Sequence, residues 1–246
     1  MARRGGHEEE MIKLEHVVLA SPEQMEFIIE GMRNSMDCWE KSDSEVTLEQ
    51  LVWRDEKIPD KFKLGPDDHS LMQRLSNAGT DYRKFMRMMP VYARITAPLY
   101  WWKEFDTYKV GTVSNSCNDM TMYKIQEKEF TIDDFSCEHL KNAFDVSIPY
   151  ASNITSIFEY KKILEGNIEI LNNARDLYLE TKDKRFWWQM IQLLPSSYNQ
   201  TRNVMMNYEV LANIYKSRKY HNKLDEWREF CKWIEELPYS ELILSA

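Results

Sequence analysis

The sequence predicts a helix-rich α+β domain with a small mixed or antiparallel sheet and a long central helix. Its 246 residues suffice for one large domain with a buried core. Glycine and proline number only 7 and 8, and no segment has a biased composition, which is typical of a compact, helix-rich fold. We expect residues 1–10 to be a flexible N-terminal extension or a tag, and residues 11–246 to form a single domain.

A strand followed by a helix is expected at the start of this domain. Residues 12–20 carry the β-branched pattern of a strand. The run Ser21-Pro22-Glu23-Gln24 then combines an N-cap, a proline in the first turn and a capping-box glutamine. Apolar residues at helical spacing follow, so the helix is expected to extend to about residue 38.

The remaining elements are a loop or short helix over residues 41–63, a helix over 65–79, a short helix over 133–144, a long helix over 152–182 and a short helix over 184–194. Pro59 interrupts the first of these segments, Gly65-Pro66 begins the second, and Pro195 ends the last. In the long helix the apolar residues fall on changing faces, which is typical of a central helix that contacts several neighbours.

The charge and the cysteines limit the class of protein. The net charge of −8 gives no general attraction to a nucleic-acid polymer, so a nucleotide would be held by a few placed cations. The four cysteines are scattered without a CxxC pair, which indicates reduced thiols in a cytoplasmic protein and no metal site. No apolar run reaches membrane-spanning length, and we expect no signal peptide and no membrane partner.

An aromatic stretch over residues 94–123 has the composition of a pocket wall. Tryptophans and tyrosines lie there beside charged and small polar residues, so flat rings supply contact area while polar groups orient a ligand. Paired tryptophans seldom stay exposed. We therefore expect core or subunit contacts for Trp101, Trp102, Trp187 and Trp188.

The same stretch resembles the signature region of the flavin-dependent thymidylate synthases, the ThyX family. In that family an Ala/Val-Pro-aliphatic-aromatic entry leads through Arg-Gln-Trp to Arg-His-Arg, seven further residues and a Ser. Residues 97–100, Ala-Pro-Leu-Tyr, match the entry, while the residues at the Arg-Gln-Trp and Arg-His-Arg positions mostly differ from the family. The resemblance implies substrate contacts at Lys103, Glu104, Asn115, Ser116 and Cys117. It implies cofactor contacts at Thr107, Tyr108 and Lys109.

A second block, residues 193–237, resembles the ThyX run Leu-Pro-x-x-x-Tyr, Asn-x-Arg-x-Leu, Asn, Leu-Arg, His and Gln-Trp more closely. The resemblance implies that Arg218 is the catalytic residue, which holds the carbonyl edge of dUMP and polarises the ring. The implied flavin contacts in this block are Asn207, Asn213 and His221.

Three departures from the family pattern concern charge. Glu209 stands where the family has an arginine, and Arg87 stands on the glutamate of the family's Phe-Glu-His. The family's phosphate-binding arginine before Pro195 is absent, and Arg185 or Arg202 could replace it by a different path.

The resemblance implies reductive methylation of dUMP, with reduced FAD as the hydride donor and methylenetetrahydrofolate as the carbon source. It also implies a homotetramer with sites between subunits. The alternative is a ThyX-fold protein that binds or modifies another pyrimidine nucleotide, or a catalytically inactive nucleotide-binding or scaffold homologue. The replaced charges favour this alternative, whereas the retained asparagines, arginine and aromatic entry favour a surviving pocket.

The candidate residues also have ordinary structural interpretations. Arg218 lies near an expected helix C-terminus, where the helix dipole favours a cation. Asn207 and Asn213 are six residues apart, so in one helix they would lie on different faces and need a ligand that spans them. Cys117 has no histidine in its local sequence, which disfavours a nucleophilic role. The other candidates with a surface or capping interpretation are Tyr108, Lys109 and His221.

Overall fold

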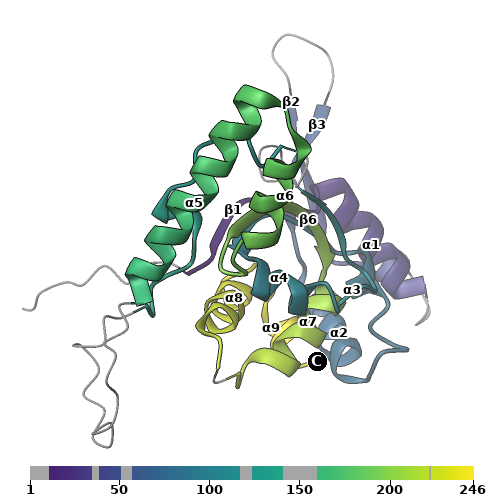
Figure 1. Cartoon of the computed structure of the whole chain (residues 1–246). Coiled ribbons are helices and arrows are strands. Elements are labelled where there is room, and N and C mark those ends of the chain that lie inside the picture. The colour runs from purple at the N-terminus through teal and green to yellow at the C-terminus, as the bar shows by residue number, and fades with distance from the viewer. Residues whose placement is uncertain (1–10, 35–38, 51–56, 117–123, 141–159, 222) are drawn as a thin grey trace, which may run out of the picture. The chain divides into compact units, whose positions relative to one another are not determined.

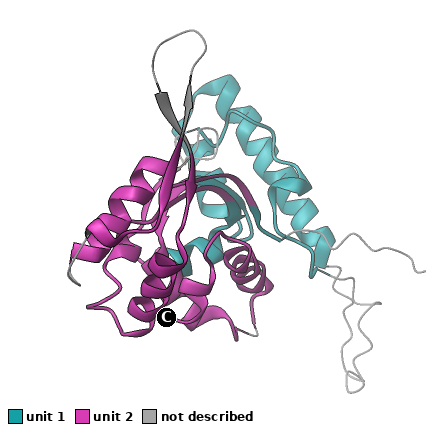
Figure 2. Ribbon diagram, turned by 180° about the vertical axis from the view of Figure 1, so that it is seen from behind, with its two compact units in different colours: residues 1–13, 96–105, 116–202 teal, residues 14–95, 106–115, 203–246 magenta. Residues whose placement is uncertain are grey.

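The computed structural model describes residues 11–34, 39–50, 57–116, 124–140, 160–221 and 223–246. The chain divides into two compact units (Figure 2). Unit 1 holds residues 1–13, 96–105 and 116–202, and unit 2 holds residues 14–95, 106–115 and 203–246. Within the described residues, no helix is long and apolar enough to cross a membrane.

Unit 2 carries most of the sheet and a set of mainly short helices (Figure 1). Unit 2 holds the strands β2 (Glu45–Gln50) and β3 (Lys57–Lys63). It also holds most of β1 (Lys13–Leu19), β4 (Pro90–Pro98), β5 (Val113–Ser116) and β6 (Asn199–Asn207). Its helices are α1 (Pro22–Asn34), η1 (Trp39–Lys41), α2 (Pro66–Asn77), α3 (Phe85–Met88), α7 (Tyr208–Arg218), α8 (Asp225–Glu235) and α9 (Glu241–Leu244).

The main sheet has the strand order β1-β4-β6-β5, and its two long central strands are antiparallel. Arg94 Nε donates to Asn203 Oδ1, and the hydroxyls of Thr96 and Thr201 lie 2.7 Å apart. The residue numbers in each pair add to the same sum, as an antiparallel register requires. The predicted α+β class with a small antiparallel sheet is therefore confirmed.

The predicted capping signals act as expected in α1. Ser21 N donates to Gln24 Oε1 at 2.9 Å, and Gln24 N donates to Ser21 Oγ at 3.2 Å, which is the reciprocal capping box. The helix extends at least to Asn34, and its expected end near residue 38 lies outside the described residues. Gly79, with φ +104°, follows the end of α2 near the predicted position.

The prediction of a loop or short helix over residues 41–63 was wrong. This segment forms an antiparallel hairpin of β2 and β3, preceded by the single turn η1. Pro59 lies opposite Leu48, directly after a register shift at Thr47. A proline is tolerated in a strand at such an irregularity, because no regular ladder hydrogen bond is required of its nitrogen.

A buried carboxylate ties α2 to the segment before the hairpin. Asp68 is fully buried and accepts hydrogen bonds from Ser42 Oγ, Ser44 Oγ and Arg33 Nε. Burial alone would raise the pKa of Asp68, but these donors lower it below its usual value. The charged form of Asp68 is therefore part of the folded state of unit 2.

Unit 1 contains α4 (Leu99–Phe105), η3 (Ile132–Asp134), α5 (Tyr160–Thr181) and α6 (Lys184–Leu193). The long helix and the short helix after it are confirmed over the described residues, while residues 152–159 lie outside them. The predicted helix over residues 133–144 was wrong as far as residue 140, because only the turn η3 forms. Phe135 instead pairs with Tyr198 in an antiparallel bridge. Residues 141–144 lie outside the described part.

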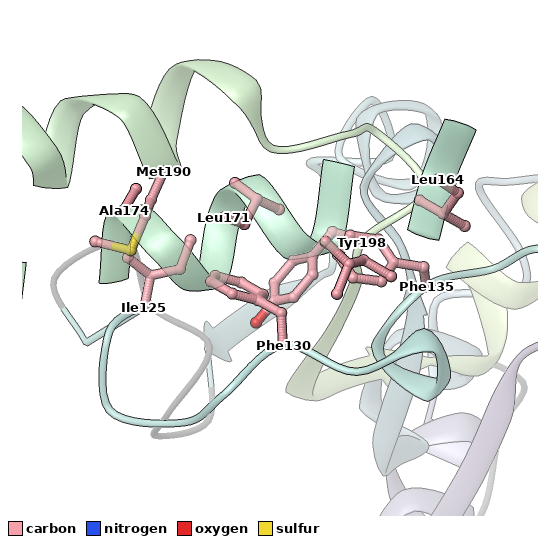
Figure 3. Packing of buried hydrophobic residues seen from close by; sticks show 9 residues of the cluster. Ile125, Phe130, Phe135, Leu164, Leu171, Ala174, Met190 and Tyr198 are labelled. Carbon is pink, nitrogen blue, oxygen red and sulfur yellow. The ribbon is translucent and has the colours of Figure 1, made fainter. Parts of the chain in front are cut away.

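The core of unit 1 joins α5 to the loop before η3 (Figure 3). Phe130, Phe135 and Tyr198 form an aromatic group with ring centroids 5.5 to 6.4 Å apart. Leu171 of α5 is fully buried in the same cluster. Asn172 closes the contact by donating to Phe130 O and accepting from Phe130 N.

The tryptophan pairs have different environments. Trp101 and Trp102 are buried, as predicted for core residues, and both rings pack against Phe105. Trp187 is half-buried beside the α5 core, and Trp188 is exposed. The core interpretation therefore describes the first pair better than the second.

Candidate functional site

The two segments singled out in the sequence meet in unit 2. Arg218, the last residue of α7, donates from Nε to Tyr108 Oη at 2.9 Å, although the two residues are 110 positions apart. The guanidinium carbon of Arg218 lies 4.5 Å from the ring centroid of Trp227 and 5.7 Å from that of Tyr108. We call Tyr108, Arg218 and Trp227 the Arg218 site.

Packing holds the Arg218 site in place. Trp227 of α8 is fully buried and makes edge contacts with Tyr108 and Phe230. A guanidinium over a tryptophan face gains a cation–π interaction, and the stack fixes the plane of the five N–H donors. Tyr108 adds a hydrogen bond at one edge of that plane. The arrangement therefore presents an arginine whose orientation is set before any ligand arrives.

The buried thiol of Cys231, near Arg218, is unreactive. Burial and, to a smaller extent, the charge of Glu235 raise the pKa of Cys231 to about 11, against the opposing charge of Arg218. The thiol is therefore protonated at neutral pH. A protonated, buried thiol is a poor nucleophile, so the chemistry of this site does not run through Cys231.

Asn207 lies at the junction of β6 and α7, not inside a helix as expected. Its Oδ1 accepts a hydrogen bond from Val210 N at 2.9 Å and thereby caps α7. Its Nδ2 lies beside Gly111, where an added Cβ would come within 2.8 Å of it. Gly111 has φ +85°, so both its backbone conformation and its lack of a side chain suit this close approach.

A second group of charged residues surrounds Glu209. Arg87 donates to both Glu209 oxygens, and Arg83 Nε donates to Glu209 Oε1 at 3.4 Å. Arg83 Nη2 also donates to Asn213 Oδ1 at 3.3 Å. Both Arg83 and Glu209 are buried. We call Arg83, Arg87, Glu209 and Asn213 the Glu209 cluster.

Two of the departures implied by the resemblance lie in the Glu209 cluster. Arg87, expected at a family glutamate, and Glu209, expected at a family arginine, are ion-paired with each other. If these positions correspond, both charges are inverted together and their sum is unchanged. Burial alone would raise the pKa of Glu209, but Arg87 and Arg83 lower it below its usual value.

A hollow of about 520 Å³ is lined by residues of the four strands of the main sheet. Its lining includes Asn115, Tyr92 and Arg94. Arg94 Nε donates to Asn203 Oδ1 at 3.3 Å. The hollow thus combines an aromatic ring, amides and a cation, and it contains one of the predicted substrate contacts.

The other predicted site residues are more dispersed. Lys103 is exposed and Glu104 half-buried on α4 in unit 1, whereas Thr107 and Lys109 are exposed in unit 2. His221 Nδ1 accepts from Leu224 N at 3.3 Å, which places the proton of its neutral form on Nε2. The side chain of Ser116 and the whole of Cys117 lie outside the described residues.

The two arginines suggested for phosphate binding differ in how they are held. Arg185 is largely exposed and pairs with Asp183, the N-cap residue of α6. The guanidinium carbon of Arg202 lies 4.2 Å from the ring centroid of Trp102, and its Nε donates to Gln200 Oε1 at 2.8 Å. Arg202 is therefore the better oriented of the two.

Sequence reasoning did not name Arg83 as a site residue, and it quoted Trp227 only as part of a motif. Arg83 lies before α3, outside the helix that carries Arg87, so no helical spacing in the sequence reveals that both contact Glu209. Within the part of the chain that the structure describes, no group of three or more His, Cys, Asp or Glu residues could hold a metal ion.

Comparison with known proteins places the fold. No protein-family model matches the sequence, and the comparison with curated proteins found no match. A flavin-dependent thymidylate synthase ThyX from Helicobacter pylori, complexed with FAD and dUMP, matches with a TM-score of 0.57 at 17% identity, over 95% of this chain and 96% of that chain. A second Helicobacter pylori ThyX structure with FAD and dUMP gives 0.56 at 15% identity, over 95% and 96%.

The third match is the UMP/dUMP methylase PolB from Streptomyces cacaoi, bound with 5-Br dUMP, with a TM-score of 0.55 at 11% identity over 95% of this chain and 94% of that chain. These likenesses define the class: the chain has the ThyX fold. Because the identities are so low, it is a divergent member of that fold.

Proposed function

We propose that this chain binds a pyrimidine nucleotide of the dUMP class and modifies its base, with Arg218 as the residue that holds the carbonyl edge. The observation that carries the proposal is the fixed guanidinium of Arg218, stacked on Trp227 and hydrogen-bonded to Tyr108. A rigid planar donor suits a uracil carbonyl and loses little side-chain entropy on binding. The ThyX structures bound to dUMP and the PolB structure bound to 5-Br dUMP support this ligand class.

Arg218 would do electrostatic work on the bound base. Its positive charge stabilises negative charge on the oxygen of the ring carbonyl. This electrostatic stabilisation is stronger in a site that excludes water. The buried ring of Trp227 covers one face of the guanidinium and limits its contact with water. Arg218 is therefore proposed both to bind the base and to polarise it.

The residues present fit a flavin as the cofactor. Asn207 Nδ2, which lies beside Gly111, is the proposed donor to a ring carbonyl of the flavin. Asn213, the exposed ammonium of Lys109 and His221 Nε2 are the other proposed contacts, together with Thr107 and Tyr108. Bound FAD, in its reduced form, would supply a hydride for reductive methylation, with methylenetetrahydrofolate as the carbon source.

The substrate contacts proposed from the resemblance are Lys103, Glu104, Asn115, Ser116 and Cys117. Asn115 has the strongest support, because it lines the hollow that also contains Tyr92 and Arg94. Arg202 is the proposed phosphate ligand, since its stack on Trp102 limits the motion of the guanidinium. We also propose, from the resemblance, a cytoplasmic homotetramer.

A second candidate function is nucleotide binding without flavin chemistry. One observation favours it: Asn207 Oδ1 and Asn213 Oδ1 both accept hydrogen bonds from within the chain. An amide that is already engaged gives a cofactor fewer contacts. Flavin content therefore separates this candidate from the enzyme proposal.

Two measurements test the proposal. Purified protein titrated with FAD should show the flavin absorption bands after gel filtration, and dUMP should raise its melting temperature. Arg218→Ala should remove most of the shift caused by dUMP, whereas Arg228→Ala, which alters an exposed ion pair on α8, should leave it unchanged.

If dUMP raises the melting temperature but the protein retains no flavin, the second candidate function, nucleotide binding without flavin chemistry, is supported. No shift from dUMP in the parent protein would overturn the proposed function.

A further inference from the structure

Unit 2 contains a second hollow, of about 340 Å³, that shares no lining residue with the Arg218 site, the Glu209 cluster or the hollow of the main sheet. Its walls come from the end of β1, the start of α1, strand β3, the segment before β4, the start of α7 and the segment before α9. This volume is typical of a small-molecule site. Because Tyr239 lines it, we call it the Tyr239 hollow.

The walls of the Tyr239 hollow are apolar and stiff. Apart from one lysine and two tyrosines, every lining residue is apolar, and three of them are the prolines Pro22, Pro90 and Pro238. A proline ring fixes φ and carries no N–H, so it forms a wall that needs no hydrogen-bond partner. A stiff wall loses little conformational entropy when a ligand binds.

Tyr208, one of the two tyrosines, holds the walls together. Its N donates to Met89 O at 3.2 Å, and its Oη donates to Pro238 O. Tyr208 thus ties the segment before β4 to the segment before α9. Its hydroxyl proton is already used within the chain, so Tyr208 shapes the hollow.

Tyr239, the other tyrosine, has an unusual backbone and an available hydroxyl. Its φ of +57° lies in the left-handed region, which a bulky side chain rarely adopts. Residues strained in this way gather at ligand sites. The half-buried Tyr239 makes no hydrogen bond through its hydroxyl to any residue that the structure describes. Burial raises the pKa of Tyr239, so the hydroxyl is a donor at neutral pH.

We propose that the Tyr239 hollow binds a small neutral aromatic molecule with one hydrogen-bond acceptor, and that the Tyr239 hydroxyl donates to this acceptor. Apolar walls that include Phe62 favour a ring, and one polar group is enough to orient it. A neutral ligand also fits the surrounding charges. The carboxylate of Glu241 acts on Tyr239 and disfavours an anion, while Lys61 in the lining disfavours a cation. The inference does not rest on nucleotide binding.

Acetophenone and ethylbenzene test the proposal as a matched pair, because the two molecules have similar shapes and only acetophenone has an acceptor. Ligand-observed NMR titration into the full chain gives a dissociation constant for each. Tyr239→Phe should raise the dissociation constant of acetophenone about threefold to tenfold, as expected for one lost hydrogen bond, and leave that of ethylbenzene unchanged.

Tyr82→Phe is the matched control. Tyr82 lines another hollow of unit 2, of about 350 Å³, and the substitution removes the same hydroxyl. It should change the affinity for neither molecule. An unchanged affinity for acetophenone in Tyr239→Phe, or a weaker one in Tyr82→Phe, would overturn the proposal.

Filling the hollow tests the site itself. Ala20→Leu places a larger side chain on a half-buried part of the wall, so saturable binding of both molecules should be lost while the circular dichroism is unchanged. If Ala20→Leu does not fold, the two tyrosine variants still decide the matter. A parent protein that binds neither molecule saturably, or a folded Ala20→Leu variant that binds both as the parent does, would contradict the proposal.

Discussion

The Arg218 site and the Glu209 cluster both hold arginines in unit 2, but by different means. In the Glu209 cluster a buried carboxylate accepts hydrogen bonds from Arg83 and Arg87. In the Arg218 site the guanidinium is oriented by the ring of Trp227 and the phenol of Tyr108. The carboxylate of Glu209 neutralises the charge of its arginines, whereas the ring of Trp227 and the phenol of Tyr108 fix the orientation of the Arg218 guanidinium.

This difference predicts different consequences of mutation. Breaking a buried ion pair leaves a desolvated charge and lowers stability. Removing an oriented arginine at the surface of a site mainly removes a contact made to a ligand. The Glu209 cluster is therefore expected to determine stability, and the Arg218 site to determine binding.

The largest expected effect follows Glu209→Ala. The substitution removes the carboxylate that Arg83 contacts in a buried setting, so the free energy of unfolding should fall by about 3–5 kcal/mol in urea denaturation. Asp225→Ala removes a carboxylate that pairs with the exposed Arg228, and should cost less than about 1 kcal/mol. Similar small losses in both variants would remove the distinction between structural and ligand-binding arginines.

A smaller effect is expected at Gly111, in the segment that carries Tyr108. Gly111→Ala should lower the free energy of unfolding by about 1–2 kcal/mol, because φ is +85° and the new methyl group would meet Asn207 Nδ2. Gly31→Ala is the control, since no atom lies within 4 Å of its added Cβ inside α1, and it should stabilise by about 0.5–1 kcal/mol. Stabilisation by both substitutions would mean that Asn207 does not pack against Gly111.

The smallest expected effect is on the pH dependence of stability. The pKa values of Glu209 and Asp68 are lowered in the folded state, so their contribution is present above the unfolded-state values and is lost as the pH falls through the folded ones. Stability should therefore decline below about pH 4. The decline should be shallower in Glu209→Gln, and denaturation series at several pH values would measure it. If stability fell equally steeply with decreasing pH in both proteins, the ion pair of Glu209 would not contribute to the stability of the folded state.

Local signals in the sequence predicted α1, α2, α5 and α6. The capping box at Ser21 and Gln24, and the stop at Pro195, act within a few residues and can therefore be read directly. The hairpin of β2 and β3 and the strand β6 were missed, because strands are stabilised by distant partners. Pro59 was read as a breaker, although a register shift accommodates it.

The site was predicted only in outline. The resemblance named Tyr108 and Arg218, and the structure brings them into contact. It also named Glu209 and Arg87 as isolated departures, but their pairing spans 122 positions and no local pattern reveals it. Asn207 was expected on the same helix as Asn213, whereas it caps α7 from the end of β6. Contacts of this kind depend on the fold, which the sequence pattern gives only coarsely.

The most direct measurement of the central claim is calorimetric titration of dUMP into the parent protein and into Arg218→Lys. Lysine keeps the positive charge but loses the planar donors that Trp227 and Tyr108 orient. The dissociation constant should rise at least about tenfold, equivalent to about 1.4 kcal/mol, with little change in melting temperature. Equal affinity in the two proteins would show that the orientation of Arg218 does not determine nucleotide binding.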